Sequence, residues 1–258
     1  MIYFWEELTT IKISELSSKK PVVILPVGAT EQHGPHLPTG VDHFIVDEII
    51  RRTTDLIDFN VLVLPTIKYG KSIEHANYPG TISLGSSTLC SVFRDIARSV
   101  KNSGFDKLLV LNGHGGNYNI LSSLVRDLSI ELNITAVLCD WDSLIPLECE
   151  CYERKERCYG VHGGQIETSL MLKSHGKLVE KNQIKNFHSK AEKFDKANQV
   201  LRYLGPTSIG WKIEDLNSEG AVGNAVKSTE SDGESIYMLA VEKLHKLLVE
   251  LDTLNKGL

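Results

Sequence analysis

The feature that most constrains the fold is an uninterrupted apolar run from Pro21 to Gly28. Its residues, PVVILPVG, do not alternate between apolar and polar positions. A strand with that pattern is buried on both faces, as in a parallel sheet that is covered by helices on each side. The run therefore predicts a central parallel strand with a hydrophobic core on each face of its sheet.

Further apolar runs alternate with helical patterns along the chain. We expect strands at Val22–Val27, Asn60–Ile67, Lys107–Leu111 and Ile134–Trp141. Apolar residues spaced three and four apart predict helices at about His43–Ile57, Leu89–Ser103, Asn119–Leu132, Gln165–Ser174 and Glu234–Leu254. Strands separated by helices of this length form βαβ units. We therefore expect one α/β domain over 1–258, a three-layer α/β/α sandwich with a mainly parallel sheet.

Composition excludes several classes of protein. The formal net charge is -5 and no block of basic residues stands out, which argues against a nucleic-acid partner. No apolar segment approaches ~20 uninterrupted residues, so no membrane span is expected. The first ten residues, MIYFWEELTT, lack the basic start of a signal peptide, so we expect a cytoplasmic protein.

The residues that directly follow the first strand have the pattern of a metal site. They read EQHGPHLPTGVDH, with Glu31 and His33 two apart, so both side chains point the same way in extended backbone. The glycine and proline turns that follow can fold Asp42 back towards them. Ligands in open α/β sheets bind at the carboxyl ends of the strands, where these residues lie.

A second cluster, LNGHGGN at residues 111–117, follows the third predicted strand. It places His114 on the same rim of the sheet as Glu31, where we expect it to be a metal ligand. Its glycines could instead form an anion cradle, which would suggest a protein that binds nucleotide phosphates. Neither the dinucleotide nor the P-loop pattern is present, so this alternative has weak support.

Two more loops carry similar side chains. Residues 70–81, GKSIEHANYPGT, follow the second strand, and residues 161–169, VHGGQIETS, place His162 just before a helix and Glu167 in its first turns. Taken alone, each of these residues is a common loop or helix-start residue. Four such loops at successive element ends are hard to explain by chance.

Together, the motifs EQHGPHLPTGVD, SxEHxxYPGT, NGHGGN and HGGxxETS resemble the creatininase family, the creatinine amidohydrolases. The resemblance covers most of the chain in the expected order, including the turn GAVGN at residues 220–224. It implies a single α/β/α domain, a metal centre on the rim of the sheet and a homo-oligomer, often a hexamer.

The resemblance also implies roles for individual residues. The metal ligands are expected to be Glu31, His33, Asp42 as the bridging carboxylate, His114 and Glu167. The expected catalytic residues are His162, Glu167 and Glu74, and the expected substrate-binding residues are Ser72, His75, Gly115 and Tyr159.

The chain departs from creatininase in the loop after His114. Creatininase carries an aromatic residue and then a metal-binding glutamate there, whereas this chain has Gly115 and Gly116. One ligand of the second ion is therefore absent or supplied by Glu167. Creatinine is not the expected substrate because a flat cationic ring needs an aromatic partner, although Trp141, Tyr159 or Trp211 could supply one. Relatives with the glycine version include deformylases and a peptide-maturation enzyme.

Carboxylate and imidazole ligands without thiolate suit Zn, Mn or Fe. Two divalent ions carry four positive charges against three carboxylates, and such a centre lowers the pKa of a water from ~15.7 towards ~7. We therefore expect a dinuclear hydrolase that cleaves an amide, cyclic amide or formamide C–N bond in a small molecule. Either His162 or Glu74 would protonate the departing nitrogen. The alternatives are a non-catalytic metal- or ligand-binding protein and a peptide-maturation hydrolase.

The cysteines and two polar segments say less about function than the motifs above. Cys149, Cys151 and Cys158 lie in a charged stretch without metal-site spacing, and we expect reduced thiols in a surface loop. Cys90 and Cys139 are expected to be buried free thiols. Lysine-rich residues 177–202 predict a solvated helix or a subunit contact, and the glycine-rich residues 205–225 predict a lid or a surface connection.

Overall fold

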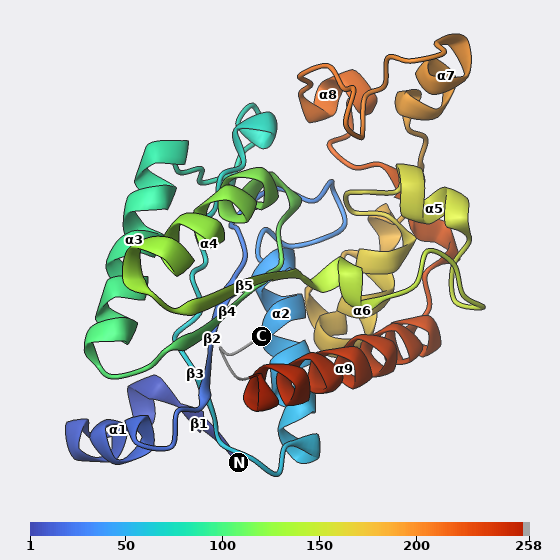
Figure 1. The fold of residues 1–258 in the computed structure, drawn as a ribbon. Helices are drawn as coiled ribbons and strands as arrows, with labels where there is room; N and C mark the ends of the chain where they lie inside the picture. The colour runs from blue at the N-terminus through green and yellow to red at the C-terminus, as the bar shows by residue number, and fades with distance from the viewer. Residues whose placement is uncertain (255–258) are drawn as a thin grey trace.

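The computed structural model describes residues 1–254, which form a parallel five-stranded sheet and, apart from it, a short antiparallel pair. The strand order is β1 (Ile2–Phe4), β3 (Val61–Val63), β2 (Val22–Val27), β4 (Lys107–Asn112) and β5 (Thr135–Asp140), as Figure 1 shows. Neighbouring strands of the five are all parallel. Their carboxyl ends therefore meet along one edge of the sheet, which is where the metal-site loops begin.

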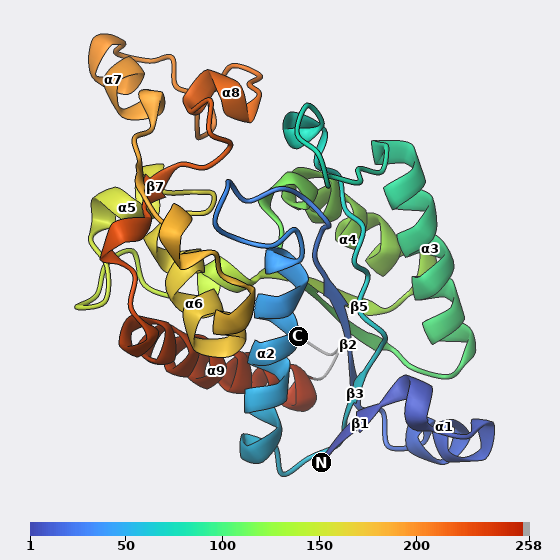
Figure 2. The same cartoon turned by 180° about the vertical axis from the view of Figure 1, so that it is seen from behind.

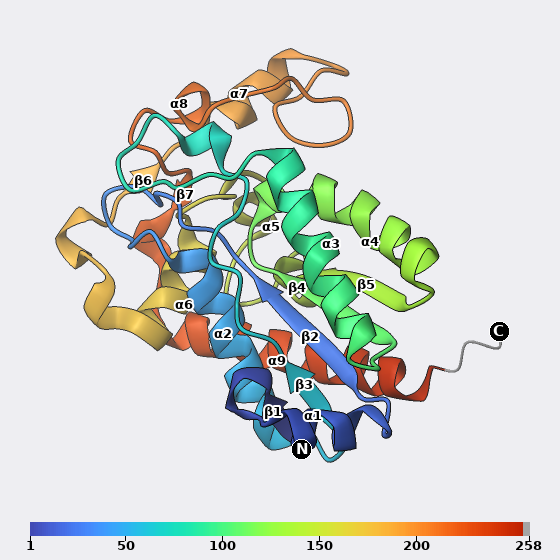
Figure 3. The ribbon, with the colours of Figure 1, turned by 90° about the vertical axis from the view of Figure 1, so that its left-hand side faces the viewer.

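Helices cover both faces of the sheet, so the predicted three-layer α/β/α arrangement is confirmed. One layer contains α3 (Ser86–Asn102) and α4 (Tyr118–Leu132). The other contains α2 (Val41–Thr53), α6 (Gln165–His175) and α9 (Glu230–Thr253), as seen from behind in Figure 2 and from the side in Figure 3.

The apolar run of β2 explains why the sheet needs both layers. Val22 and Ile24 belong to the core beneath α2 and α9, whereas Val23 and Leu25 belong to the core beneath α3 and α4. All four side chains are almost completely buried. Successive residues of a strand point to opposite faces, so a strand that is apolar at every position must be covered twice.

The predicted elements are largely in place, with differences that have local causes. Strand β3 is much shorter than the predicted Asn60–Ile67, because Pro65 lacks an N–H for the sheet ladder. The edge strand β1 and helix α1 (Thr10–Ser17) were not predicted. Strand β1 has only three residues, which is too few for a pattern to show.

Helix α5 (Arg154–Tyr159) and the segments between α6 and α9 form a separate group of short elements. These segments contain β6 (Asn186–Phe187), α7 (Lys190–Ala197), α8 (Ile213–Leu216) and β7 (Gly223–Asn224), with β6 and β7 antiparallel. Helices α7 and α8 lie beyond the carboxyl edge of the sheet in Figures 1 and 2. Among residues 1–254, no helix is long and apolar enough to cross a membrane.

Short 3-10 helices complete the chain between these elements. They lie at Trp5–Glu7, Thr54–Leu56, Ile73–His75, Gly115–Asn117, Trp141–Leu144, Gly176–Leu178, Lys181–Gln183 and Ala225–Lys227.

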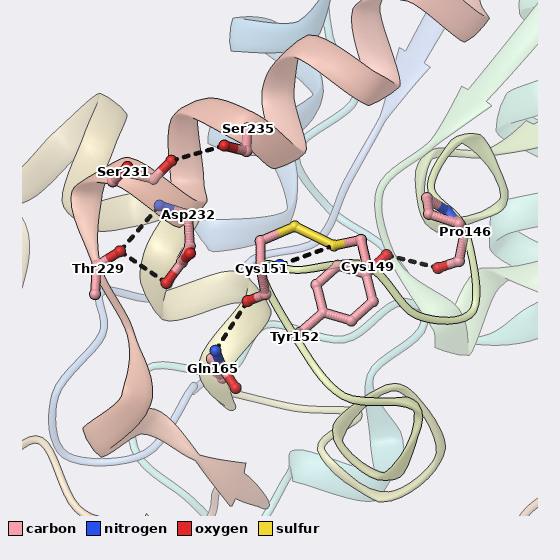
Figure 4. The surroundings of a disulfide bond; sticks show 9 residues. All are labelled: Pro146, Cys149, Cys151, Tyr152, Gln165, Thr229, Ser231, Asp232 and Ser235. Carbon is pink, nitrogen blue, oxygen red and sulfur yellow. Dashed lines mark hydrogen bonds between the residues drawn. A yellow bond between two sulfur atoms is a disulfide. The ribbon is translucent and has the colours of Figure 1, made fainter.

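The cysteines correct one expectation. Cys149 and Cys151 form a disulfide instead of remaining reduced (Figure 4). Cys158 is a free, exposed thiol. Cys139 is buried as expected, but Cys90 is only half-buried. The side-chain amide of Gln165, the first residue of α6, donates a hydrogen bond of 3.0 Å to the carbonyl of Cys151. The disulfide loop is thereby attached to the start of α6.

Truncation of a residue in the middle of β2 tests the double-sided core. We expect Leu25→Ala to lower the free energy of unfolding by about 3 kcal/mol, because it leaves a cavity between the sheet and α3. Ile130→Ala, on the solvent side of α4 and 76% exposed, is the control and should change it by less than about 0.5 kcal/mol. Urea denaturation measures both, and equal effects would contradict the packing described here.

Candidate metal centre

Five of the predicted ligands converge at the carboxyl edge of the sheet. Glu31 and His33 follow β2, Asp42 lies in the first turn of α2, His114 follows β4 and Glu167 lies in the first turn of α6. The Nε2 atom of His33 is 3.3 Å from Asp42 Oδ1 and 3.9 Å from Glu167 Oε2. His114 Nε2 is 3.3 Å from Glu31 Oε2, and its Nδ1 is 3.5 Å from Asp42 Oδ2.

Two glycines allow the start of α2 to approach the sheet. A Cβ on Gly28, at the end of β2, would lie 2.6 Å from the backbone nitrogen of His43. A Cβ on Gly113, after β4, would overlap the carbonyl oxygen of Asp42. Only glycine permits such close backbone packing. The backbone at Asp42, the carboxylate predicted to bridge two ions, is therefore held close to the two central strands.

Each of three histidines turns one ring nitrogen towards the carboxylates. The other nitrogen donates its hydrogen to a backbone carbonyl: His33 Nδ1 to Glu31 (3.0 Å), His114 Nε2 to Lys71 (2.9 Å) and His162 Nε2 to Gln32 (2.6 Å). A carbonyl only accepts, so these bonds fix the tautomer of each ring. In the neutral ring the nitrogen that faces the carboxylates carries the lone pair, as a metal ligand requires.

Several atoms in this cluster lack partners that a cation would supply. Within the described chain, Glu31 Oε2, His33 Nε2 and Asp42 Oδ2 are buried without a hydrogen bond. Three overlapping sets of side chains can each surround one ion: Glu31 with His33 and His162, Glu31 with Asp42 and His114, and His33 with Asp42 and Glu167. The side chains present therefore fit a centre with at least two ion positions that share Asp42.

The protonation behaviour of the cluster also indicates a missing positive charge. Burial, together with the nearby Asp42 charge, raises the pKa of Glu31 to about 7, and burial raises the pKa of Glu167. Burial lowers the pKa of His33, but the surrounding carboxylates, Asp42 first, outweigh it and raise this pKa to about 10. His33 therefore holds a proton at neutral pH, and Glu31 and Glu167 take up protons more readily than exposed carboxylates do, so a divalent ion that binds here displaces protons.

A cavity of about 600 Å³ opens onto this cluster. Its walls include eight of the predicted site residues: Glu31, Asp42, Glu74, His75, His114, Gly115, His162 and Glu167. Further wall residues were not predicted as site residues; they are Lys71, Asp140, Asp142 and Arg157. Trp141 and Trp211, which were named as possible aromatic partners, also line the cavity. Lys71 lies in the predicted loop of residues 70–81, whereas the others lie outside the recognised motifs and are brought to the cavity only by the fold.

Two predicted substrate-binding residues lie elsewhere, within the part of the chain that the structure describes. Ser72 is fully buried beneath His114, with its hydroxyl 3.1 Å from the ring Nε2, so it supports the imidazole and does not line the cavity. Tyr159 lines a separate hollow of about 190 Å³ beside Glu192. Their positions do not suit the direct substrate contacts that we expected.

A stack of three imidazoles lies beside the cavity, and two of them, His75 and His162, line its wall. The ring of His162 stacks between those of His33 and His75, with centroids 4.1 Å apart on each side. Burial and the neighbouring imidazoles lower the pKa of His75 to about 3 and that of His162 well below its usual value, so both rings are neutral. Gln32, a residue not predicted to take part, donates to His75 Nδ1 at 2.7 Å and fixes its orientation.

The loop after His114 differs from creatininase in a way that the packing explains. A Cβ on Gly116 would lie 2.5 Å from His114 Nε2 and 2.6 Å from Glu74 Oε1. The space beside His114 is thus already filled by Glu74. A Cβ on Gly115 would instead point into open space.

The family model of creatininase, described as creatinine amidohydrolase, matches residues 6–248. The chain belongs to the creatininase family. A mycofactocin precursor peptide peptidase from Mycolicibacterium smegmatis is 35% identical over 240 residues, which cover 92% of this chain and 87% of the relative. A creatinine amidohydrolase from Pseudomonas putida is 32% identical over 178 residues, which cover 63% of this chain and 68% of the relative.

Solved creatininase structures share the fold. A manganese form superposes with a TM-score of 0.80 at 23% identity, covering 97% of this chain and 98% of that chain. A mutant form described as Zn-Zn type gives 0.78 at 24% identity, covering 96% and 97%. The protein is therefore a creatininase-family hydrolase whose structural neighbours are manganese and zinc forms, and its own Glu, Asp and His groups can hold metal ions.

Metal affinity of this creatininase-family member should depend steeply on pH. An ion needs Glu31 ionised and His33 Nε2 free, yet the metal-free pKa values are about 7 and about 10. Lowering the pH from 8 to 6 should therefore weaken binding by about tenfold per unit for each proton displaced. Calorimetric titration in buffers of different ionisation enthalpy measures affinity and proton release together. An affinity unchanged across this range would contradict the described protonation.

The predicted second ion position can be tested with Glu167. We expect Glu167→Ala to keep one tightly bound ion, held by Glu31, Asp42 and His114, and to lose the other. Glu74→Ala is the matched control, because Glu74 lines the same cavity outside the three ligand sets. Elemental analysis after gel filtration counts the ions. Two ions at full occupancy in Glu167→Ala would show that Glu167 is not a ligand.

Proposed function

We propose that this protein is a metal-dependent amidohydrolase that cleaves an amide, cyclic amide or formamide C–N bond in a small molecule. The observation that carries this proposal is the convergence of the buried, unpartnered atoms Glu31 Oε2, Asp42 Oδ2 and His33 Nε2 at a cavity of about 600 Å³, whose wall includes both carboxylates. Cavities of this size suit small molecules. Two divalent ions, zinc, manganese or iron, would be held by Glu31, His33, Asp42, His114 and Glu167.

Divalent ions held there would lower the pKa of a water molecule and polarise a carbonyl oxygen. The chain itself must position the substrate and handle protons. The ring hydrogen of His162 is donated to Gln32, and its other nitrogen faces Glu31 Oε1 at 3.4 Å. His162 therefore acts as a ligand or as part of the ligand scaffold and has no proton to give to the departing nitrogen.

Glu74 is the better candidate for proton transfer. Its carboxylate lies on the cavity wall and its Oε2 is 4.0 Å from the ammonium of Lys71. A carboxylate in this place can take a proton from the attacking water and pass it to the nitrogen that leaves. Lys71 and Arg157 on the wall are paired with Glu74 and Asp142, so they offer hydrogen-bond donors to a substrate carbonyl without an excess of positive charge.

The proposed substrate is not creatinine. Gly115 offers no aromatic surface beside His114, but Trp141 and Trp211 line other parts of the cavity and can contact a ring there. The relative named creatinine amidohydrolase therefore supports the reaction type and not the substrate.

A second candidate function is hydrolysis at the end of a peptide. It is favoured by the relative that is 35% identical and named a mycofactocin precursor peptide peptidase. The catalytic residues proposed above would be the same, since a peptide bond is also an amide. The two candidates differ only in the part of the substrate that would occupy the outer cavity. This part of the cavity is lined by Trp211 and by the segment between α7 and α8.

Loading and removal of metal, together with Glu31→Gln, test the proposed function. Metal-free protein should be inactive on a panel of cyclic amides, formamides and short peptides, and added Zn²⁺, Mn²⁺ or Fe²⁺ should restore turnover. Glu31→Gln should reduce turnover by several orders of magnitude, because it removes a ligand shared by two ion positions. Glu15→Gln is the control and should leave turnover unchanged, because this side chain on α1 is 59% exposed and pairs only with Lys12 at the surface.

The same panel separates the alternatives. Binding of a panel compound without turnover in metal-loaded protein would favour a non-catalytic binding protein. Tight binding of ATP or ADP to metal-free protein would favour a nucleotide-binding role. Turnover of peptides alone would favour the peptide-maturation activity.

A further inference from the structure

A buried carboxylate outside the metal centre, that of Glu156 on α5, joins three segments of the chain. Glu156 is only 9% exposed. Its Oε1 accepts hydrogen bonds from the backbone N–H groups of Gln165 (2.7 Å) and Asn224 (3.2 Å), and its Oε2 accepts from Asn224 at 3.0 Å. One side chain thus ties α5 to the first residue of α6 and to β7.

Three glycines from these segments make room for the carboxylate. A Cβ on Gly160, Gly164 or Gly223 would overlap Glu156 Oε1. Gly223 also has a φ of +128°, which L side chains rarely adopt. Because the glycines enclose the carboxylate from different sides, it has little freedom to shift.

The negative charge is stabilised by backbone groups. Gln165 is the first residue of α6, an eleven-residue helix, and its N–H points at the carboxylate. The N-terminus of a helix favours a negative charge through its unpaired N–H groups and its dipole. A neutral side chain at this position would lose that interaction even if it kept the shape.

The segments that Glu156 connects carry two residues of the candidate metal centre, Glu167 and His162. Glu167 lies two residues after Gln165, and its Oε2 accepts a hydrogen bond of 2.6 Å from the N–H of Gly163. The carbonyl of His162 accepts a hydrogen bond of 2.8 Å from Val222, the residue just before Gly223. Movement of α5, α6 or β7 relative to one another would therefore displace both Glu167 and His162.

The other candidate ligands are held in place by the sheet and do not depend on Glu156. Glu31, Asp42 and His114 lie on the loops that follow β2 and β4 and on the start of α2, where Gly28 and Gly113 fix the backbone. The sheet and its glycines thus hold Glu31, Asp42 and His114, whereas Glu156 holds the segments that carry Glu167 and His162.

We propose that Glu156 is a positioning residue that places Glu167 and His162 against His33 and Asp42, and so determines how firmly the second ion is held. This inference rests on the dinuclear centre of the proposed function, but it does not require amide hydrolysis. Glu156 touches no ligand atom itself and acts through the backbone at Gln165 and Asn224.

Metal titration of two variants tests the proposal. Metal-stripped Glu156→Ala and the nearly isosteric Glu156→Gln are titrated with Mn²⁺ by calorimetry and by electron paramagnetic resonance. The first ion should bind within about threefold of the parent affinity, and the second should bind at least about tenfold more weakly, which is a loss of ~1.4 kcal/mol. The exchange-coupled signal of a manganese pair should give way to that of isolated ions.

Glu153→Ala is the matched control, because Glu153 lies three residues earlier, is 70% exposed and pairs with Lys227 at the surface. It should bind both ions like the parent. Parent-like binding of both ions in a folded Glu156 variant would overturn the proposal, and so would equal weakening of both ions. If circular dichroism shows that Glu156→Ala is unfolded, Glu156→Gln decides, and unfolding of both variants would assign Glu156 to fold stability instead. Absence of amidase activity with normal two-ion binding would contradict the proposed function and leave the role of Glu156 standing.

Discussion

Mutual repulsion among buried carboxylates is the constraint on which the rest of this structure depends. Glu31, Asp42 and Glu167 all lie within ion-pair distance of His33, and Glu31 and Asp42 are almost completely buried. Charges at such separations inside a protein interact far more strongly than in water. The cluster can be neutralised either by protons or by cations, and its raised pKa values and unpartnered atoms both reflect this requirement.

The sequence predicted the parts of this arrangement that follow from backbone periodicity. The continuous apolar run at β2 implied a parallel sheet with two covered faces, and parallel strands bring their carboxyl ends to one edge. That is sufficient to gather Glu31, Asp42 and His114. The edge strand β1 gave no signal because three residues cannot display a period.

Other parts depend on side-chain direction within loops, which periodicity does not determine. Ser72 was expected to face the substrate, yet its hydroxyl turns beneath His114. Tyr159 lines a separate hollow, whereas Arg157, two residues earlier on α5, lines the cavity. Glu156 stands in a run of charged residues, and its burial depends on glycines that are distant in the sequence. No local pattern distinguishes it from its solvated neighbours.

The disulfide between Cys149 and Cys151 affects how the protein responds to its redox surroundings. It links residues only two apart, so it encloses a very small loop and constrains the unfolded chain little, by about 1.6 kcal/mol in the chain-entropy model. Around it, Tyr152 donates to the carbonyl of Pro146 at 2.6 Å and Gln165 donates to Cys151, and neither bond requires the sulfur bridge (Figure 4). The fold is therefore compatible with reducing as well as oxidising compartments.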